Sequence, residues 1–73
     1  MVLETVKIRN RIFQVRFAEN VGFAVVEVKD GARKSVGLGF LQKRGKEWVD
    51  QTGRVATDPD VIAAIEKVRK CIM

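Results

Sequence analysis

Apolar and polar side chains alternate along most of the chain, in short runs separated by turn-forming residues. The alternation is clearest over 12–18, where Phe13, Val15 and Phe17 fall on one face and polar residues fall on the other. A period of two is typical of β-strands with one buried face. The pattern predicts strands at about 2–9, 12–18, 22–29, 34–42, 46–50 and 54–57.

Residues suited to tight turns lie between these runs. Asp30-Gly31 is the strongest hairpin signal, because both residue types tolerate the positive φ that a two-residue turn requires. Asn10 and the stretch Asn20–Gly22 indicate two further turns. Turns this short join antiparallel neighbours, so we expect the strands to follow one another as a meander.

The third and fourth runs carry apolar residues that decide which sheet face is buried. The third run is apolar on both faces, which is typical of a central strand. In the fourth run Gly37 and Gly39 indicate a bend. We expect the buried face to carry Val15, Val26, Val28, Leu38 and Phe40, and the opposite face to leave Phe23, Val25 and Leu41 uncovered.

A helix is predicted over 59–72. Asp58 is a suitable N-cap and Pro59 suits the first helical position, where its missing N–H costs nothing. A stripe of apolar residues recurs every three or four positions, at Val61, Ile65, Val68 and Ile72. The whole chain, 1–73, is therefore expected to be a single α+β domain. It combines a small antiparallel β-meander of four to six strands, curled toward a half-open barrel, with one C-terminal α-helix packed on one face.

The residue inventory argues against an enzyme. The chain has no His and no Tyr, and Ser35 and Cys71 are the single residues of their types. Neither has a His to activate it, and a zinc site needs three or four Cys or His ligands. Asp50, Asp58 and Asp60 are close enough in sequence to hold Mg²⁺, but an Asp-rich helix start is the commoner reason for such a group. We expect no catalytic residues, no cofactor and no bound metal.

Cysteine content and hydropathy bear on location. One cysteine forms no internal disulfide, which is typical of a reducing compartment. No apolar run approaches the ~18 residues needed to span a bilayer, and no signal-peptide pattern opens the sequence. We expect a cytoplasmic protein with no membrane partner.

Charge suggests a class of partner. Lys and Arg number 14 against 9 Asp and Glu, giving a net charge of +5. Basic sheet surfaces suit nucleic acid, because cations contact phosphates and flat rings stack on bases. A small basic sheet closed by a C-terminal helix is also similar in topology to the small archaeal chromatin proteins and to single-strand-binding coactivator domains. No diagnostic motif aligns with either, and no residue role follows from this similarity.

Two functions are predicted. The first is a nucleic-acid-binding module, for DNA or RNA. Its contact residues are predicted to be Lys7, Arg9, Arg11, Arg16, Lys29, Arg33 and Lys34, with Trp48 or Phe23 stacking on bases. The alternative for these two rings is a place in the core of the curled sheet or under a loop. The alternative is a homo-oligomerising protein-interaction module, in which a homodimer covers the apolar sheet face that the helix leaves free. The two functions can coexist, and we expect a homodimer held through the uncovered sheet face or through an edge strand.

Overall fold

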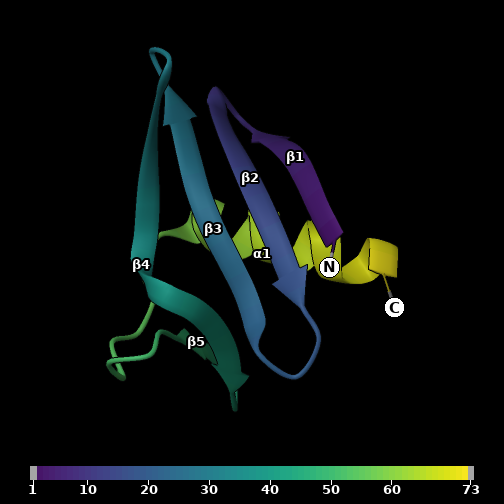
Figure 1. Cartoon of the computed structure of the whole chain (residues 1–73), viewed down its shortest axis with the longest axis vertical. Coiled ribbons are helices and arrows are strands. Elements are labelled where there is room, and N and C mark those ends of the chain that lie inside the picture. The colour runs from purple at the N-terminus through teal and green to yellow at the C-terminus, as the bar shows by residue number, and fades with distance from the viewer. Residues whose placement is uncertain (1, 73) are drawn as a thin grey trace.

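The computed structural model describes residues 2–72, which form one antiparallel sheet and one helix. The sheet consists of β1 (Val2–Ile8), β2 (Arg11–Ala18), β3 (Gly22–Lys29), β4 (Ala32–Arg44) and β5 (Glu47–Val49), in that spatial order. The helix α1 (Pro59–Ile72) lies across one face of this open sheet (Figure 1). The predicted α+β meander with a C-terminal helix is confirmed, with five strands and no closure into a barrel.

The residues with positive φ in the turns are those predicted from the sequence, with one exception. Asp30 (φ 53°) and Gly31 (φ 78°) are both in the left-handed region, as the hairpin between β3 and β4 requires. In the turn between β1 and β2, however, the residue with positive φ is Arg9 (φ 57°) rather than Asn10. A non-glycine residue in this region carries a local conformational cost of about 1–2 kcal/mol.

The predicted strand at 54–57 is wrong. Val55 makes only an isolated bridge to Val49, because the chain between them folds into a tight loop. Within this loop the Asp50 N–H donates to Arg54 O (3.0 Å), and the Ala56 N–H donates to Trp48 O (2.8 Å). The backbone groups are therefore satisfied locally and no sixth strand forms.

A large bulge interrupts β4. Val25 of β3 pairs with Val36, but Phe23 pairs with Leu41, so the segment 37–40 lies opposite the single residue between them. Gly37 and Gly39 both have φ 73°, which confirms that these glycines mark a bend. The three additional residues reverse the alternation of β4, so that Leu41 rather than Phe40 faces the core.

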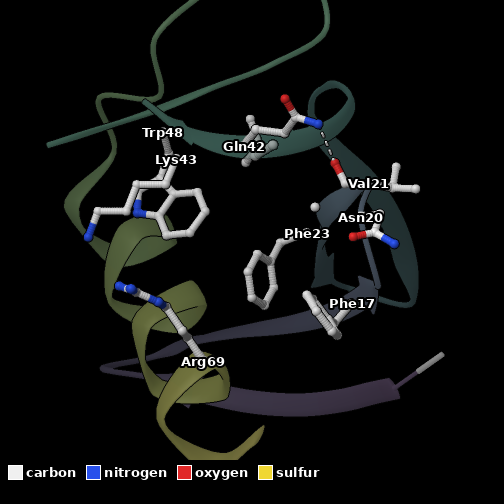
Figure 2. Close-up of a pocket in the computed structure, with 10 residues that line it drawn as sticks. Phe17, Asn20, Val21, Phe23, Gln42, Lys43, Trp48 and Arg69 are labelled. Atoms are coloured by element: carbon white, nitrogen blue, oxygen red, sulfur yellow. Dashed lines mark hydrogen bonds between the residues drawn. The ribbon is translucent and has the colours of Figure 1, made fainter. Parts of the chain in front are cut away.

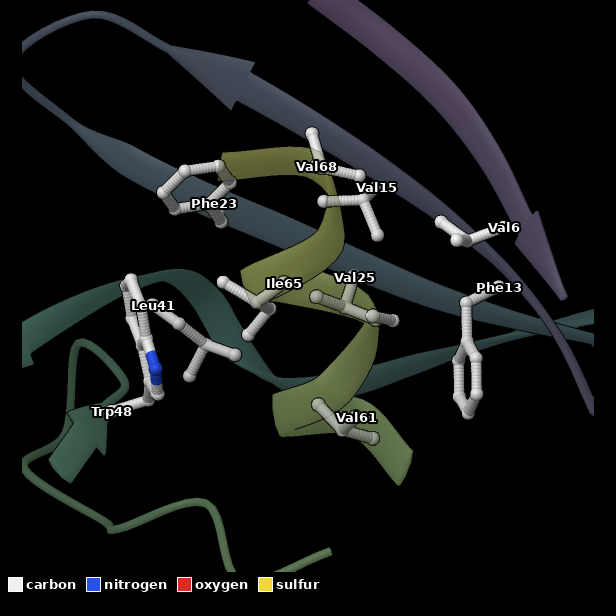
Figure 3. Close-up of a cluster of buried hydrophobic side chains, with 11 residues drawn as sticks. Val6, Phe13, Val15, Phe23, Val25, Leu41, Trp48, Val61, Ile65 and Val68 are labelled. Carbon is white, nitrogen blue, oxygen red and sulfur yellow. The ribbon is translucent and has the colours of Figure 1, made fainter. Parts of the chain in front are cut away.

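The core lies between α1 and one face of the sheet, which we call the helix side (Figure 3). Phe13, Val15, Val25 and Ile65 are 0–2 % exposed. The rest of the buried apolar cluster consists of Val6, Phe23, Leu41, Trp48, Val61, Ala64 and Val68. The helix stripe predicted from the sequence is confirmed at Val61, Ile65 and Val68.

The predicted sheet faces are wrong for β3 and β4. Phe23, Val25 and Leu41 were expected to be uncovered but are 4 % exposed or less. Val26 and Val28 are half-buried on the opposite face, and Leu38 is 60 % exposed. The register with β2 determines which face of β3 is buried, because Val15 pairs with Val25 and paired residues share a face. In β4 the bulge reverses the alternation, which is why Leu41 is buried and Leu38 is exposed.

The Ile65 side chain provides a test of helix packing. It is 0 % exposed, so Ile65→Ala removes buried methylenes and leaves a cavity. We expect a loss of about 2–4 kcal/mol in the free energy of unfolding, measured by denaturant titration. Ala63→Gly, on the exposed side of α1, is the control for helix propensity and is expected to cost about 1 kcal/mol. An Ile65→Ala loss below that of the control would show that the stripe is not packed against the sheet.

Candidate nucleic-acid interface

The sheet face opposite α1, which we call the outer face, is not covered by any element of residues 2–72. The strand registers arrange its side chains in three rows across β1 to β4. They are Lys7–Ile12–Val28–Arg33, Thr5–Gln14–Val26–Ser35 and Leu3–Arg16–Ala24. Because adjacent strands lie about 4.8 Å apart, the first row places Lys7 and Arg33 about 14 Å from each other.

Charge is segregated between the two faces of the sheet. The outer face has three cations, Lys7, Arg16 and Arg33, and all three are exposed. None of the residues in the three rows is acidic. The carboxylates of β1 to β4, Glu4 and Glu27, belong to the opposite alternation and lie on the helix side, and Glu47 of β5 pairs with Arg44 outside the three rows. Across β1 to β4 the outer face therefore presents positive charge without internal neutralisation.

Apolar groups lie between these cations. Ile12 is 41 % exposed and Leu3 is 56 % exposed, while Val26 and Val28 are half-buried beside them. Three members of the middle row, Thr5, Gln14 and Ser35, supply hydroxyl and amide groups. The surface thus combines cations, short polar side chains and branched aliphatic side chains on one twisted sheet.

Arg11, a predicted contact residue, is engaged inside the protein. Its guanidinium donates to both Glu27 carboxylate oxygens, from Nε (2.9 Å) and Nη2 (2.8 Å). Its Nη1 lies 2.8 Å from Asp58 Oδ2 and donates to Asp60 Oδ2 (3.1 Å). Asp58 also caps α1, where its Oδ1 accepts from the Asp60 N–H (3.0 Å). Arg11 therefore connects β2 and β3 to the start of the helix and is not free to contact a phosphate.

The other predicted cations lie at the end of the sheet where the β1–β2 and β3–β4 turns meet (Figure 1). Arg9 is exposed, with its Nε 3.7 Å from Asp60 Oδ1. Lys34 pairs with Glu27 across β3 and β4, and Lys29 precedes Asp30. Carboxylates accompany each of these cations, so this end of the molecule is electrostatically mixed.

The aromatic residues predicted to stack on bases are in the core. Phe23 and Trp48 are each 4 % exposed, and their rings meet edge to face with centroids 5.4 Å apart. Of the two alternatives that the sequence left open for these rings, the solvent face and the core, the structure contradicts the first and confirms the second. Val49 was expected to pack inward with Trp48 pointing away, but both residues are buried, because the loop after β5 folds back over this edge.

A shallow hollow of about 300 Å³ lies on the helix side beside this aromatic pair (Figure 2). Its floor includes Phe17 and Phe23, whose ring centroids are 4.9 Å apart. Lys43 and Arg69 are at its rim, and both pair with Glu66, at 3.7 Å and 3.4 Å. The two cations are therefore partly neutralised, and the hollow opens away from the outer face.

Asp50 has a structural role. Its carboxylate is 9 % exposed and accepts from the Thr52 hydroxyl (2.6 Å) and from the backbone N–H groups of Thr52, Arg54 and Leu38. These hydrogen bonds, that of the Thr52 hydroxyl most of all, lower the pKa of Asp50 to about 2. Asp50 thus joins the loop to the β4 bulge. Within residues 2–72 no three His, Cys, Asp or Glu side chains are grouped so as to hold a metal ion.

The lowered pKa values of three carboxyl groups predict that the fold loses stability in acid. Hydrogen bonds from Arg11 lower the pKa of Glu27 and, against the effect of burial, that of Asp58, while the pKa of Asp50 is about 2. A carboxyl group with a lowered folded-state pKa stabilises the fold above its unfolded pKa, and this stability is lost as pH falls through the folded value. We expect the melting temperature to fall from about pH 5 to about pH 2, and Asp50→Asn to reduce that dependence. Equal melting temperatures at the two ends of this range would contradict the assignment.

Sequence reasoning identified the three cations of the outer face but missed its other members. Leu3, Thr5, Ile12 and Ser35 were not predicted as contact residues. The alternation of the strands could have identified them. Thr5 and Ser35 are two positions from a predicted cation and so share its face, while Leu3 and Ile12 pair with a predicted cation on the neighbouring strand.

Comparison with family models, with curated proteins and with solved structures finds no match to this chain. No helix among the described residues has the length and apolar character required to cross a membrane.

Proposed function

We propose that this protein is a non-enzymatic nucleic-acid-binding module whose contact surface is the outer face of the sheet. The observation that carries the proposal is the segregation of charge, with Lys7, Arg16 and Arg33 in three rows of the outer face that contain no carboxylate. Affinity for nucleic acid comes largely from cations that neutralise phosphates and release condensed counterions. A face with uncompensated cations is suited to that role.

The same face indicates how the contact is made. Lys7, Arg16 and Arg33 contact phosphates, while Thr5, Gln14 and Ser35 hydrogen-bond to sugar or phosphate oxygens. Ile12 and Val28, between Lys7 and Arg33, contact the apolar edges of sugars and bases. The three rows contain no aromatic ring, so base stacking is not part of the proposal. Binding is accordingly electrostatic and weakly selective for sequence.

The alternative function is a homodimeric interaction module, supported by the exposed apolar residues Leu3 and Ile12. A face-to-face dimer through the outer face brings like cations from two copies together, which is unfavourable in a desolvated interface. An anionic partner fits this face better than a second copy. We also propose a cytoplasmic location, because the one cysteine, Cys71, is free and exposed.

The salt dependence of binding tests the proposal. If the three cations each neutralise one phosphate, the log–log slope of affinity against salt is about −2 to −3. Arg16→Ala is expected to weaken binding to all sequences alike and to flatten this slope by about 0.7–0.9. Lys70→Ala, an exposed cation on α1, is the control and leaves the slope unchanged. Equal effects of the two variants would show that net charge, and not the outer face, drives binding.

A further inference from the structure

β1 is an open edge strand. Its seven residues pair with β2 along one side, and no strand of residues 2–72 pairs with its other side. β1 contains no Pro, no bulge and no residue with positive φ. Its register with β2 is unbroken from Val2 to Ile8. A regular edge of this kind offers a row of free N–H and C=O groups to another strand.

The exposed edge of β4 is protected in the ways that natural sheets use to prevent pairing. Arg33 and Lys34 are successive cations near its start, one on each face of the sheet. Gly37 and Gly39 then form the bulge, and the Gln51 N–H donates to Leu38 O (3.2 Å), which covers the edge at that point. The contrast with β1 indicates that the two edges have different roles.

We propose that β1 pairs antiparallel with β1 of a second copy of this chain, centred on Thr5. This register aligns all seven residues of each strand and keeps the two outer faces on the same side, because it pairs residues of like alternation. Leu3 lies opposite the partner's Lys7, Glu4 lies opposite the partner's Val6, and Thr5 lies opposite the partner's Thr5. No like charges stand directly opposite each other in this register.

The helix side of this edge has a small hollow and charged side chains that a second copy can contact. A hollow beside β1 is lined by Glu4, Val6, Lys67, Val68 and others. The C-terminal end of α1 lies beyond β1 in Figure 1, so an added strand would lie next to the last turns of the helix. In the proposed register the partner's Glu4 lies opposite Val6, next to the hollow that Lys67 lines. A glutamate of one copy thus meets a lysine of the other.

The pairing extends the proposed nucleic-acid surface. Lys7 and the partner's Lys7 lie about 14 Å apart across the seam, from four residue steps of about 3.4 Å and one strand spacing. Arg16 follows on the adjacent strand of each copy. The partner copy therefore contributes cations to one continuous outer face. The dimer itself does not depend on nucleic-acid binding and is tested without it.

The molecular mass of the protein in solution tests whether two copies pair through β1. With 8.2 kDa per chain, the dimer has twice that mass, 16.4 kDa. We expect light scattering to give 16.4 kDa for the wild type at tens of micromolar, and 8.2 kDa for Thr5→Lys, which opposes two lysines at the centre of the seam. Ser35→Lys is the matched control, since Ser35 is exposed in the same row on the other edge strand, and it is expected to remain a dimer. A wild-type mass of 8.2 kDa at this concentration, or dissociation by both variants, overturns the proposal.

Cross-linking tests the register. In a Cys71→Ser background, Thr5→Cys is expected to cross-link to itself with a short bis-maleimide, because the two positions face each other. Leu3→Cys is expected to cross-link poorly with itself, since its counterpart lies about 14 Å away, and efficiently when mixed with Lys7→Cys. Equal self-linking at Leu3 and Thr5, or none at Thr5, would contradict the register even if the mass is that of a dimer.

Discussion

Trp48→Ala is expected to lower the free energy of unfolding by about 3–5 kcal/mol, which approaches the whole stability of a domain this small. Trp48 is 4 % exposed and lies in the buried cluster between β5 and α1. Its ring contacts Phe23 edge to face, with centroids 5.4 Å apart, and Lys43 Nζ lies 5.8 Å from its centroid. Truncation therefore removes a large buried surface together with its aromatic contact.

Urea titration followed by circular dichroism measures this loss, because the substitution removes the single tryptophan that fluorescence would report. Trp48→Phe keeps an aromatic ring and remains measurable if Trp48→Ala does not fold; it is expected to lose less. Leu38→Ala is the surface control, with 60 % exposure and an expected change within about 0.5 kcal/mol. A Trp48→Ala change as small as that of Leu38→Ala would mean that the indole is not part of the core.

The triple variant Lys7→Gln, Arg16→Gln and Arg33→Gln is expected to abolish detectable binding to nucleic acid. At ~50 mM salt the release of counterions by one phosphate contact is worth about tenfold in affinity, so three contacts are worth about a thousandfold. The three side chains are exposed, and the salt bridges among the described residues involve other cations. The variant is therefore expected to keep the wild-type fold.

A second triple variant tests whether affinity depends on the position of the cations or only on the net charge of the protein. Lys34→Gln, Lys46→Gln and Lys70→Gln lowers the net charge from +5 to +2, as the outer-face variant does, but at exposed positions away from the outer face. It is expected to retain most of the wild-type affinity. If both triple variants lose the same affinity, the outer face has no special role and the protein binds by net charge alone.

The helix and the order of the strands could be predicted from the sequence because their signals are local. Asp58 and Pro59 fix the start of α1, and Val61, Ile65 and Val68 fix its buried side. Asp30-Gly31 fixes a hairpin through the positive φ of both residues. Each of these features depends on residues that are close to each other in the sequence.

The faces of β3 and β4 could not be predicted in the same way. β3 is apolar on both sides, so its alternation does not show whether Val25 or Val26 is buried; the register with β2 decides it. The bulge at Gly37 and Gly39 shifts β4 and buries Leu41 in place of Phe40. Phe23 was assigned to the solvent face for the same reason, since a single error in alternation moves a whole strand to the other face. Trp48 could not be placed from alternation, because the loop after β5 buries both Trp48 and Val49.

The candidate interface was predicted only in part. Lys7, Arg16 and Arg33 could be recognised as polar positions of alternating strands. Arg11 lies in an equally regular strand, but its role depends on Glu27, Asp58 and Asp60, which only the folded chain brings to it. Sequence reasoning therefore found the positive charge but could not separate the cations that are paired inside the protein from those that are free.

Fluorescence anisotropy of the wild-type protein with labelled single-stranded DNA, double-stranded DNA and RNA tests the central claim most directly. Titrations at ~50 mM salt should reach saturation with at least one of the three probes, and affinity should fall as salt is raised, with a log–log slope of about −2 to −3 per copy. Absence of binding to all three probes at tens of micromolar protein would contradict the claim that the outer face is a nucleic-acid interface.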